Sequence, residues 1–273
     1  MGMTMPLLRF ARGACRVAWP AVVLAGSAGA SADSGPICTD RPTRANGVCT
    51  VPAGRLQIEA DVLAYLRDER AGVTSESTTV AAATIKYGLD TRADLELGWT
   101  AWTENEVEQA GRRVRTDGSG DLVVRYKRRL SAEEAALGVS VIPYVKLPSA
   151  PGDIGNERVE GGLIVPLSTA LPGGVALTLG PEIDVLAEAD GSGTRINVTN
   201  LVNLSRSFGP LTLYGELWSA NDFAAEGDGD QYSADVAASW LVTADLQLDA
   251  GANFGLDADT PDYQVYLGVS ARF

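Results

Sequence analysis

Apolar and polar residues alternate along most of the chain. In DYQVYLGVSARF, residues 262–273, Val265 and Leu267 fall on one side of an extended strand, whereas Gln264 and Ser270 fall on the other. This period of two is typical of a β-strand that separates an apolar from a polar environment. About twelve such segments follow one another, at residues 55–69, 79–90, 93–105, 120–130, 136–148, 158–169, 175–188, 195–208, 211–220, 232–243, 246–257 and 262–273.

The connections between these segments alternate in length. Long stretches such as RDERAGVTSES (67–77) and ENEVEQAGRRVRTDGSG (104–120) take turns with short ones such as GLDTRAD (88–94) and LSAEEA (130–135). Outer-membrane barrels have tight turns at one end and longer loops at the other, and their closure satisfies every backbone group inside hydrocarbon. The chain is therefore predicted to be all-β, with residues 55–273 forming an antiparallel up-and-down transmembrane β-barrel of about 12 strands.

Three prolines fall inside the predicted strands. Pro143, Pro166 and Pro181 each lack the backbone N–H that a ladder requires. We expect each of them to coincide with a bulge or with a gap in the ladder.

Aromatic residues recur near the predicted strand ends. Tyr87, Trp99, Trp218 and Trp240 suit the interfacial girdles of a membrane barrel. The last strand ends on Phe273 and carries two tyrosines, which resembles the C-terminal assembly signal of bacterial outer-membrane barrels. The expected partners are therefore outer-membrane lipid and the barrel-assembly machinery.

The first 32 residues have the layout of a secretory signal peptide. Three arginines precede an apolar stretch that begins at Val17, and Ala30 and Ala32 form an A-x-A pattern. A membrane anchor fits less well, because the apolar stretch is short and rich in alanine and glycine. We expect cleavage of residues 1–32 before Asp33 and export of the mature chain to the periplasm.

Charge and composition exclude several classes of function. The formal net charge is −13, and loss of the signal peptide removes three arginines but no acid, which argues against a nucleic-acid partner. The chain has no histidine, so Ser-His and Cys-His nucleophile systems are closed to it. No catalytic residue, cofactor site or metal site is predicted. The acidic stretches 226–230 and 257–262 lack an ordered ligand spacing and are interpreted as solvated loops.

Two cysteines remain after the signal peptide, Cys38 and Cys49. In an oxidising compartment such a pair most often closes a disulfide loop, with two reduced thiols as the alternative. Residues 33–54 are expected to form a periplasmic N-terminal segment that contains this loop.

The stretch TDRPTRANGVCTVPAGRLQIEADV (39–62) and the later blocks GDLVVRYKRRL, IPYVKLPSAPGDIGN and GGLIVPLS resemble the outer-membrane transporters of the phenol meta-degradation family. The motif residues that carry the resemblance include Asp40, Arg41, Pro42, Pro52, Gly54, Gln57 and Glu59. The resemblance implies a bacterial outer-membrane protein that moves small molecules, aromatic compounds among them. Cys38 and Cys49 depart from the family pattern, and this leaves open whether the segment plugs the lumen or hangs in the periplasm.

If the apolar face of the strands meets lipid, the polar face lines the lumen. The predicted basic arc is Arg125, Lys127, Lys146 and Arg158, and the predicted acidic arc is Glu59, Asp61, Glu182, Asp184, Glu188, Glu216, Asp235 and Asp249. Charges segregated in this way would create a field across the pore that favours polar solutes. The alternative is that these groups form salt bridges across a plugged lumen and stabilise it.

The function predicted from the sequence is an outer-membrane channel or transporter that passes small solutes through a charged lumen. The alternative is a structural or adhesive outer-membrane barrel that acts through its loops. A lipid- or peptide-cleaving enzyme is disfavoured by the missing histidine, and a soluble exported β-sandwich by the alternating connections.

Overall fold

The computed structural model describes residues 35–188, 193–223 and 229–273, all within one compact unit, Asp33–Phe273. The predicted signal peptide, residues 1–32, lies outside the described residues. No helix among the described residues is long and apolar enough to cross a membrane.

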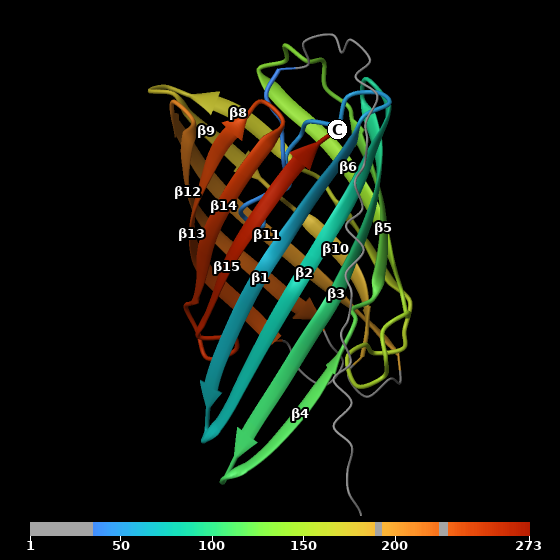
Figure 1. The fold of residues 1–273 in the computed structure, drawn as a ribbon, viewed down its shortest axis with the longest axis vertical. Helices are drawn as coiled ribbons and strands as arrows, with labels where there is room; N and C mark the ends of the chain where they lie inside the picture. Colours follow the sequence, from blue (N-terminus) through green and yellow to red (C-terminus); the bar gives the residue numbers. More distant parts are fainter. Residues whose placement is uncertain (1–34, 189–192, 224–228) are drawn as a thin grey trace, which may run out of the picture. The chain divides into compact units, whose positions relative to one another are not determined.

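The described residues form one antiparallel sheet that closes on itself, because β1 pairs with β15 (Figure 1). The strands are β1 (Leu56–Arg70), β2 (Val73–Asp90), β3 (Ala93–Gln109), β4 (Arg112–Gly118), β5 (Leu122–Arg129), β6 (Leu137–Leu147), β7 (Glu160–Ile164), β8 (Leu167–Leu171), β9 (Val175–Leu179), β10 (Glu182–Ala187), β11 (Thr194–Phe208), β12 (Leu211–Phe223), β13 (Gly229–Thr243), β14 (Leu246–Gly255) and β15 (Tyr263–Arg272).

These fifteen segments make twelve strands of the barrel wall, because three of the wall strands are each divided in two. β4 and β5 both pair with β3, β7 and β8 both pair with β6, and β9 and β10 both pair with β11. Pro166 and Pro181 fall in two of these breaks, and Pro143 coincides with a gap in the β5–β6 ladder between the pairs Arg125–Tyr144 and Arg128–Val141, as their missing N–H groups predict. The predicted antiparallel barrel of about 12 strands is confirmed.

The connections at one end of the barrel are short, and this end also carries Phe273; we call it the terminus end. At the far end, two of the predicted long loops are tight turns instead, so these two predictions were wrong. Residues Ala71-Gly72 and Ala110-Gly111 form two-residue turns in which all four residues have positive φ, from 48° to 79°. Such turns match the twist of a hairpin, so β1 to β4 continue as strands through most of the stretches interpreted as loops. They project beyond the rest of the barrel (Figure 1).

A bulge divides β1 into two halves of opposite phase. The register against β15 shifts between Asp61 and Leu63, so Val62 and Leu63 are both exposed and Ala64 is buried. A single alternating phase through residues 55–69 would place Ala64 on the outer face and Tyr65 on the inner face, and the bulge reverses both assignments. A bulge inserts one residue and reverses the alternation, which a period of two cannot reveal.

The outer face of the barrel is apolar. Leu217, Val236 and Leu267 are each more than half exposed, at 59%, 55% and 56%, although all three are aliphatic. A soluble protein would bury such a belt, whereas lipid covers it at no cost. Tyr87, Trp99 and Trp240 belong to this outer face. Trp218 does not: it has the phase of the buried Glu216 and faces the interior.

The inner face is polar, and its side chains are buried even though they point into the barrel. Lys127, Glu96, Asp94 and Gln57 are each no more than 1% exposed. The residues that cover them belong to the segment before β1.

Candidate functional site: an N-terminal plug

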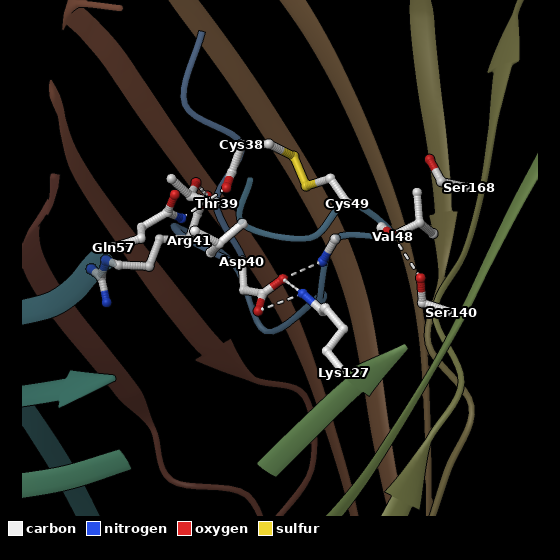
Figure 2. Close-up of a disulfide and its surroundings, with 12 residues drawn as sticks. Cys38, Thr39, Asp40, Arg41, Val48, Cys49, Gln57, Lys127, Ser140 and Ser168 are labelled. Atoms are coloured by element: carbon white, nitrogen blue, oxygen red, sulfur yellow. Dashed lines mark hydrogen bonds and ion pairs between the residues drawn. A yellow bond between two sulfur atoms is a disulfide. The ribbon is translucent and has the colours of Figure 1, made fainter. Parts of the chain in front are cut away.

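Residues 37–51 run through the interior of the barrel; we call this segment the plug. Its two arms are joined by a disulfide between Cys38 and Cys49, which confirms the predicted bridge (Figure 2). The polar contacts of the plug reach β1, β2, β3, β5, β6, β11, β12, β13 and β14. The segment expected to be periplasmic therefore fills part of the lumen.

Asp40 is the centre of an ion-pair cluster. Its carboxylate lies 2.5 Å from the Lys86 ammonium on β2 and 2.6 Å from the Lys127 ammonium on β5. Figure 2 shows the side chain pointing from the plug toward Lys127. Glu59 lies 2.7 Å from Lys86, and Glu96 lies 2.9 Å from the Arg125 guanidinium. Buried charges are tolerated only with such partners, so the cluster ties the plug to four neighbouring wall strands, β1, β2, β3 and β5.

The charge state of Asp40 follows from its neighbours. Burial alone would raise the pKa of this carboxyl, but the charges of Lys127, Lys86 and Arg125 together hold its pKa well below the ordinary value. These three cations therefore favour the ionised form of Asp40.

Arg41 attaches the plug to β1 and β14. Its guanidinium lies 2.7 Å from Asp249 on β14 and 2.7 Å from Asp61 on β1, and it stacks 5.8 Å from the centre of the Tyr266 ring. The space that it fills exists because residue 268 is glycine: a Cβ there would overlap the guanidinium. Two carboxylates and a cation–π contact thus fix one side chain.

Arg44 and the backbone next to it form a third attachment. The Arg44 Nε lies 3.2 Å from Asp235 on β13, and its guanidinium stacks 4.1 Å above the Trp218 ring. The backbone N–H groups of Arg44 and Ala45 donate to the two carboxylate oxygens of Glu216 at 3.1 and 3.2 Å. The Glu216 carboxylate thus accepts hydrogen bonds from two consecutive backbone N–H groups and fixes this part of the plug on β12.

Neutral hydrogen bonds hold the two arms of the plug near the disulfide. Gln57 donates to the Cys38 carbonyl at 2.8 Å, and Ser140 donates to the Val48 carbonyl at 2.6 Å (Figure 2). The Val51 N–H donates to Asp94 at 2.8 Å. Val51 and Pro52 then pass so close to Gly88 that no side chain fits at that position. The chain enters β1 through a turn at Gly54, whose φ is +76°.

The residues predicted to line the lumen fall into three groups. In the first group, the plug residue Asp40 pairs with two predicted basic residues, Arg125 and Lys127. Five predicted acidic residues also contact cations or backbone N–H groups of the plug: Glu59, Asp61, Glu216, Asp235 and Asp249. Lys146 on β6 and Glu182 and Asp184 on β10 form a separate group, in which Lys146 pairs with Asp121 and Glu160, and Asp184 accepts from Tyr144. Arg158 and Glu188 lie in connections outside the strands.

The motif residues of the sequence analysis lie at the plug and at its exit. Asp40 and Arg41 make the ion pairs described above, and a cis peptide bond precedes Pro42. The Pro52 carbonyl accepts from Arg55 at 3.0 Å, beside the Gly54 turn. Gln57 and Glu59 face the plug from β1.

The charged residues of the site that were in neither the predicted lumen arcs nor the motif include Lys86, Asp94, Glu96 and Arg44. Lys86 and Glu96 occupy the polar phase of their strands, so the period of two contained the signal for both. Arg44 lies outside any strand, and nothing local in the sequence indicates its contact with a residue 191 positions away.

A cavity of about 380 Å³ lies between the plug and the wall. It is lined by Asp40, Arg41, Thr43, Arg44 and Asn46 of the plug, by Glu59, Asp61, Ala82, Ala83, Thr84, Lys86, Gly98, Trp99, Thr100, Val123 and Arg125 of the wall strands, and by Asp121. Thr84, Gly98 and Thr100 lie farther from the turn at residues 91–92 than the Asp40 cluster does. The plug therefore separates this cavity from the terminus end.

Solved structures with this fold are outer-membrane barrels. The COG4313 outer membrane channel from Pseudomonas putida F1 matches with a TM-score of 0.66 and 16% identity, over 83% of this chain and 98% of that one. The β domain of the Bordetella autotransporter BrkA matches at 0.54 and 10% identity, over 81% and 100%. The NanC porin matches at 0.51 and 9% identity, over 79% and 98%. A search of curated proteins gave no match.

The fold and its apolar exterior identify a bacterial outer-membrane barrel, as predicted. A family model described as "Putative MetA-pathway of phenol degradation" matches residues 39–273, which include the plug from Thr39 onward and the whole barrel. The chain belongs to this phenol-degradation family of outer-membrane β-barrels.

Proposed function

We propose that the chain is an outer-membrane channel for small solutes whose lumen is narrowed by the plug. The observation that carries the proposal is the chemistry of the interface between plug and wall. It consists of ion pairs and hydrogen bonds, with a cavity beside it, whereas a barrel filled only for stability is packed with side chains. A polar interior is typical of barrels that conduct. The COG4313 outer membrane channel from Pseudomonas putida F1 has a similar fold, which supports the same role.

The proposed solutes are small polar molecules, with aromatic compounds among them. The family description refers to phenol degradation, and the interior presents Trp218 and Tyr266 beside guanidinium groups. The wall cations of the site lie on β2 and β5, with Glu59 and Glu96 beside them on β1 and β3, whereas β12, β13 and β14 present carboxylates. We propose that this uneven distribution of charge produces an electric field across the lumen, which acts on a solute that enters it.

The same proposal includes the surroundings of the barrel. Outer-membrane lipid would cover the aliphatic belt, and the barrel-assembly machinery would recognise the last strand, where Phe273 is 54% exposed next to the outer-facing residues of β1. Residues 1–32 would serve as the export signal and be removed.

Liposome swelling tests the proposal. Proteoliposomes that contain the purified full-length barrel should swell in small sugars, amino acids and aromatic acids, with rates that fall as solute size rises. Heat-denatured protein at the same protein-to-lipid ratio is the control. A folded barrel that gives no swelling with any of these solutes would contradict a channel.

A second candidate, a barrel that binds through its outer parts, is favoured by the projecting sheet of β1 to β4. Its outward surface carries an ion-pair ladder in which Arg113 and Arg115 contact Glu104, Glu106 and Glu108. If this function is the main one, shortening the β3–β4 hairpin should abolish surface binding and leave conductance unchanged.

A further inference from the structure

The cavity beside the plug is lined by three guanidinium groups with unused donors. A guanidinium carries five N–H groups. In the described part of the chain, the Arg44 guanidinium donates only through Nε, to Asp235. Its two terminal nitrogens therefore have no protein acceptor there. Arg41 uses Nε and Nη2, and Arg125 uses Nε and Nη2, so each of these keeps one terminal nitrogen.

The carboxylates around the same cavity are already engaged. Asp40 accepts from Lys86, Lys127 and the Gly47 N–H, and Glu59 accepts from Lys86, Gln57 and the Asp40 N–H. Asp61 pairs with Arg41, and Asp121 accepts from Lys146 and from two backbone N–H groups. The cavity therefore offers donors in excess of acceptors.

The three guanidinium groups are also held in place. Their side chains are 13%, 33% and 19% exposed for Arg41, Arg44 and Arg125. Arg44 is fixed by its stacking on Trp218, and Arg41 by Asp249 and Tyr266. A planar fork that is already ordered binds a carboxylate through two parallel hydrogen bonds at low entropic cost. Ala82 and Val123 supply an apolar wall beside these donors.

We infer that this cavity binds small organic carboxylates, with Arg44 as the main ligand-binding group and Arg41 and Arg125 beside it. The volume of about 380 Å³ lies in the range of small-molecule sites. The inference rests on the proposed function, since it names the solute class that the channel selects.

The test compares three ligands with the same ring: benzoate, benzyl alcohol and benzylamine. Calorimetric titration into the folded full-length protein in detergent should give binding of benzoate and at least about tenfold weaker binding of the other two, since a charge-assisted pair contributes that much. Arg44→Gln should weaken benzoate binding by about tenfold. Arg206→Gln is the matched control, because Arg206 is exposed on β11 and stacks on Phe208, away from the cavity.

Two further variants keep the test decisive if Arg44→Gln does not fold. Asn46→Asp is nearly isosteric and adds a carboxylate next to Arg125, so it should also weaken benzoate binding. Arg44→Lys keeps the charge but not the fork and should bind less tightly than the wild type. Equal affinity for benzoate and benzyl alcohol in the wild type, or unchanged affinity in the variants that fold, overturns the inference.

Swelling assays on the same protein separate this inference from the channel proposal. Benzoate binding without swelling supports the carboxylate site and contradicts conduction. Swelling that is equally fast for the three ligands, with no difference in binding, supports conduction and overturns the carboxylate site.

Discussion

At the scale of single residues, the interior depends on charges that have no access to bulk water. The Asp40 carboxylate lies 2.5 Å from the Lys86 ammonium and 2.6 Å from the Lys127 ammonium, and Glu96 completes the cluster with a side chain that is 0% exposed. Removing one partner of a buried ion pair costs about 3–5 kcal/mol, because the charges that remain are left uncompensated. The cluster is therefore the point at which the plug is most sensitive to substitution.

Asp40→Asn should release the plug at neutral pH and raise single-channel conductance severalfold. In the wild type, the low pKa of Asp40 means that its stabilising contribution is complete above the ordinary carboxyl pKa and is lost only as the pH falls through the depressed folded value. Wild-type conductance should therefore not rise between pH 7 and pH 4. A rise with a midpoint near about 4, the ordinary pKa of aspartate, would contradict this assignment.

Gly268→Leu should displace the Arg41 guanidinium, because a side chain at residue 268 occupies the same space. Hydrogen exchange of residues 38–48 should become faster while the strands stay protected. Gly215→Leu is the matched control, since a Cβ at Gly215 meets nothing within 4 Å and faces outward. Equal protection of the plug in the two variants would show that Gly268 is not required for Arg41.

At the scale of elements, the molecule consists of a closed β-sheet and a plug segment that is closed by a disulfide. The Cys38–Cys49 bridge closes a loop with a sequence separation of 11 and joins the two arms of the plug. The projecting ends of β1 to β4 are different, because their ion pairs are exposed to solvent, with side chains of Arg113 and Arg115 more than half accessible. Exposed pairs contribute little to stability and are screened by salt.

The double variant Cys38→Ser, Cys49→Ser should loosen the plug without unfolding the barrel. Closure of a loop of about this size contributes roughly 3 kcal/mol in the chain-entropy account. Plug amides should exchange faster, and heat-dependent gel mobility should stay unchanged because the wall strands pair independently. Loss of the folded band would contradict this separation of roles.

Substitution of two arginines compares the contribution to stability of an exposed ion pair on the projecting strands with that of an ion pair inside the barrel. Arg115→Gln should leave the thermal unfolding temperature unchanged, because the Arg115 side chain is 54% exposed and Glu106 keeps its second partner, Arg113. Arg125→Gln should lower it, because Glu96 would lose its 2.9 Å partner in the interior. A larger effect from the exposed residue than from the buried one would contradict this ranking.

At the scale of the whole molecule, much of the wall could be predicted from the sequence and the site could be predicted only in part. The period of two places Lys127, Glu216 and Asp249 inside the barrel because a strand shows the same alternation wherever it lies. It fails at Val62, where one extra residue reverses the phase. It also fails at Ala71 and Ala110, where an unusual φ in alanine continues two hairpins.

The path of the plug is not visible in the sequence for a different reason. Arg41 and Asp249 are 208 residues apart, and no local pattern links them. The charges on the wall indicated a polar interior, and the paired cysteines indicated a closed loop. Only the folded barrel brings the plug and the wall charges together, because residues as far apart in the sequence as Arg41 and Asp249 become neighbours when β1 pairs with β15.

The most direct measurement is single-channel conductance of the wild type beside a variant in which residues 37–51 are replaced by a glycine-serine linker. If the plug narrows a continuous polar path, the variant should conduct severalfold more than the wild type, with the same heat-dependent gel mobility. If the two folded proteins conduct equally, or if neither conducts, the plug does not control a path through this barrel.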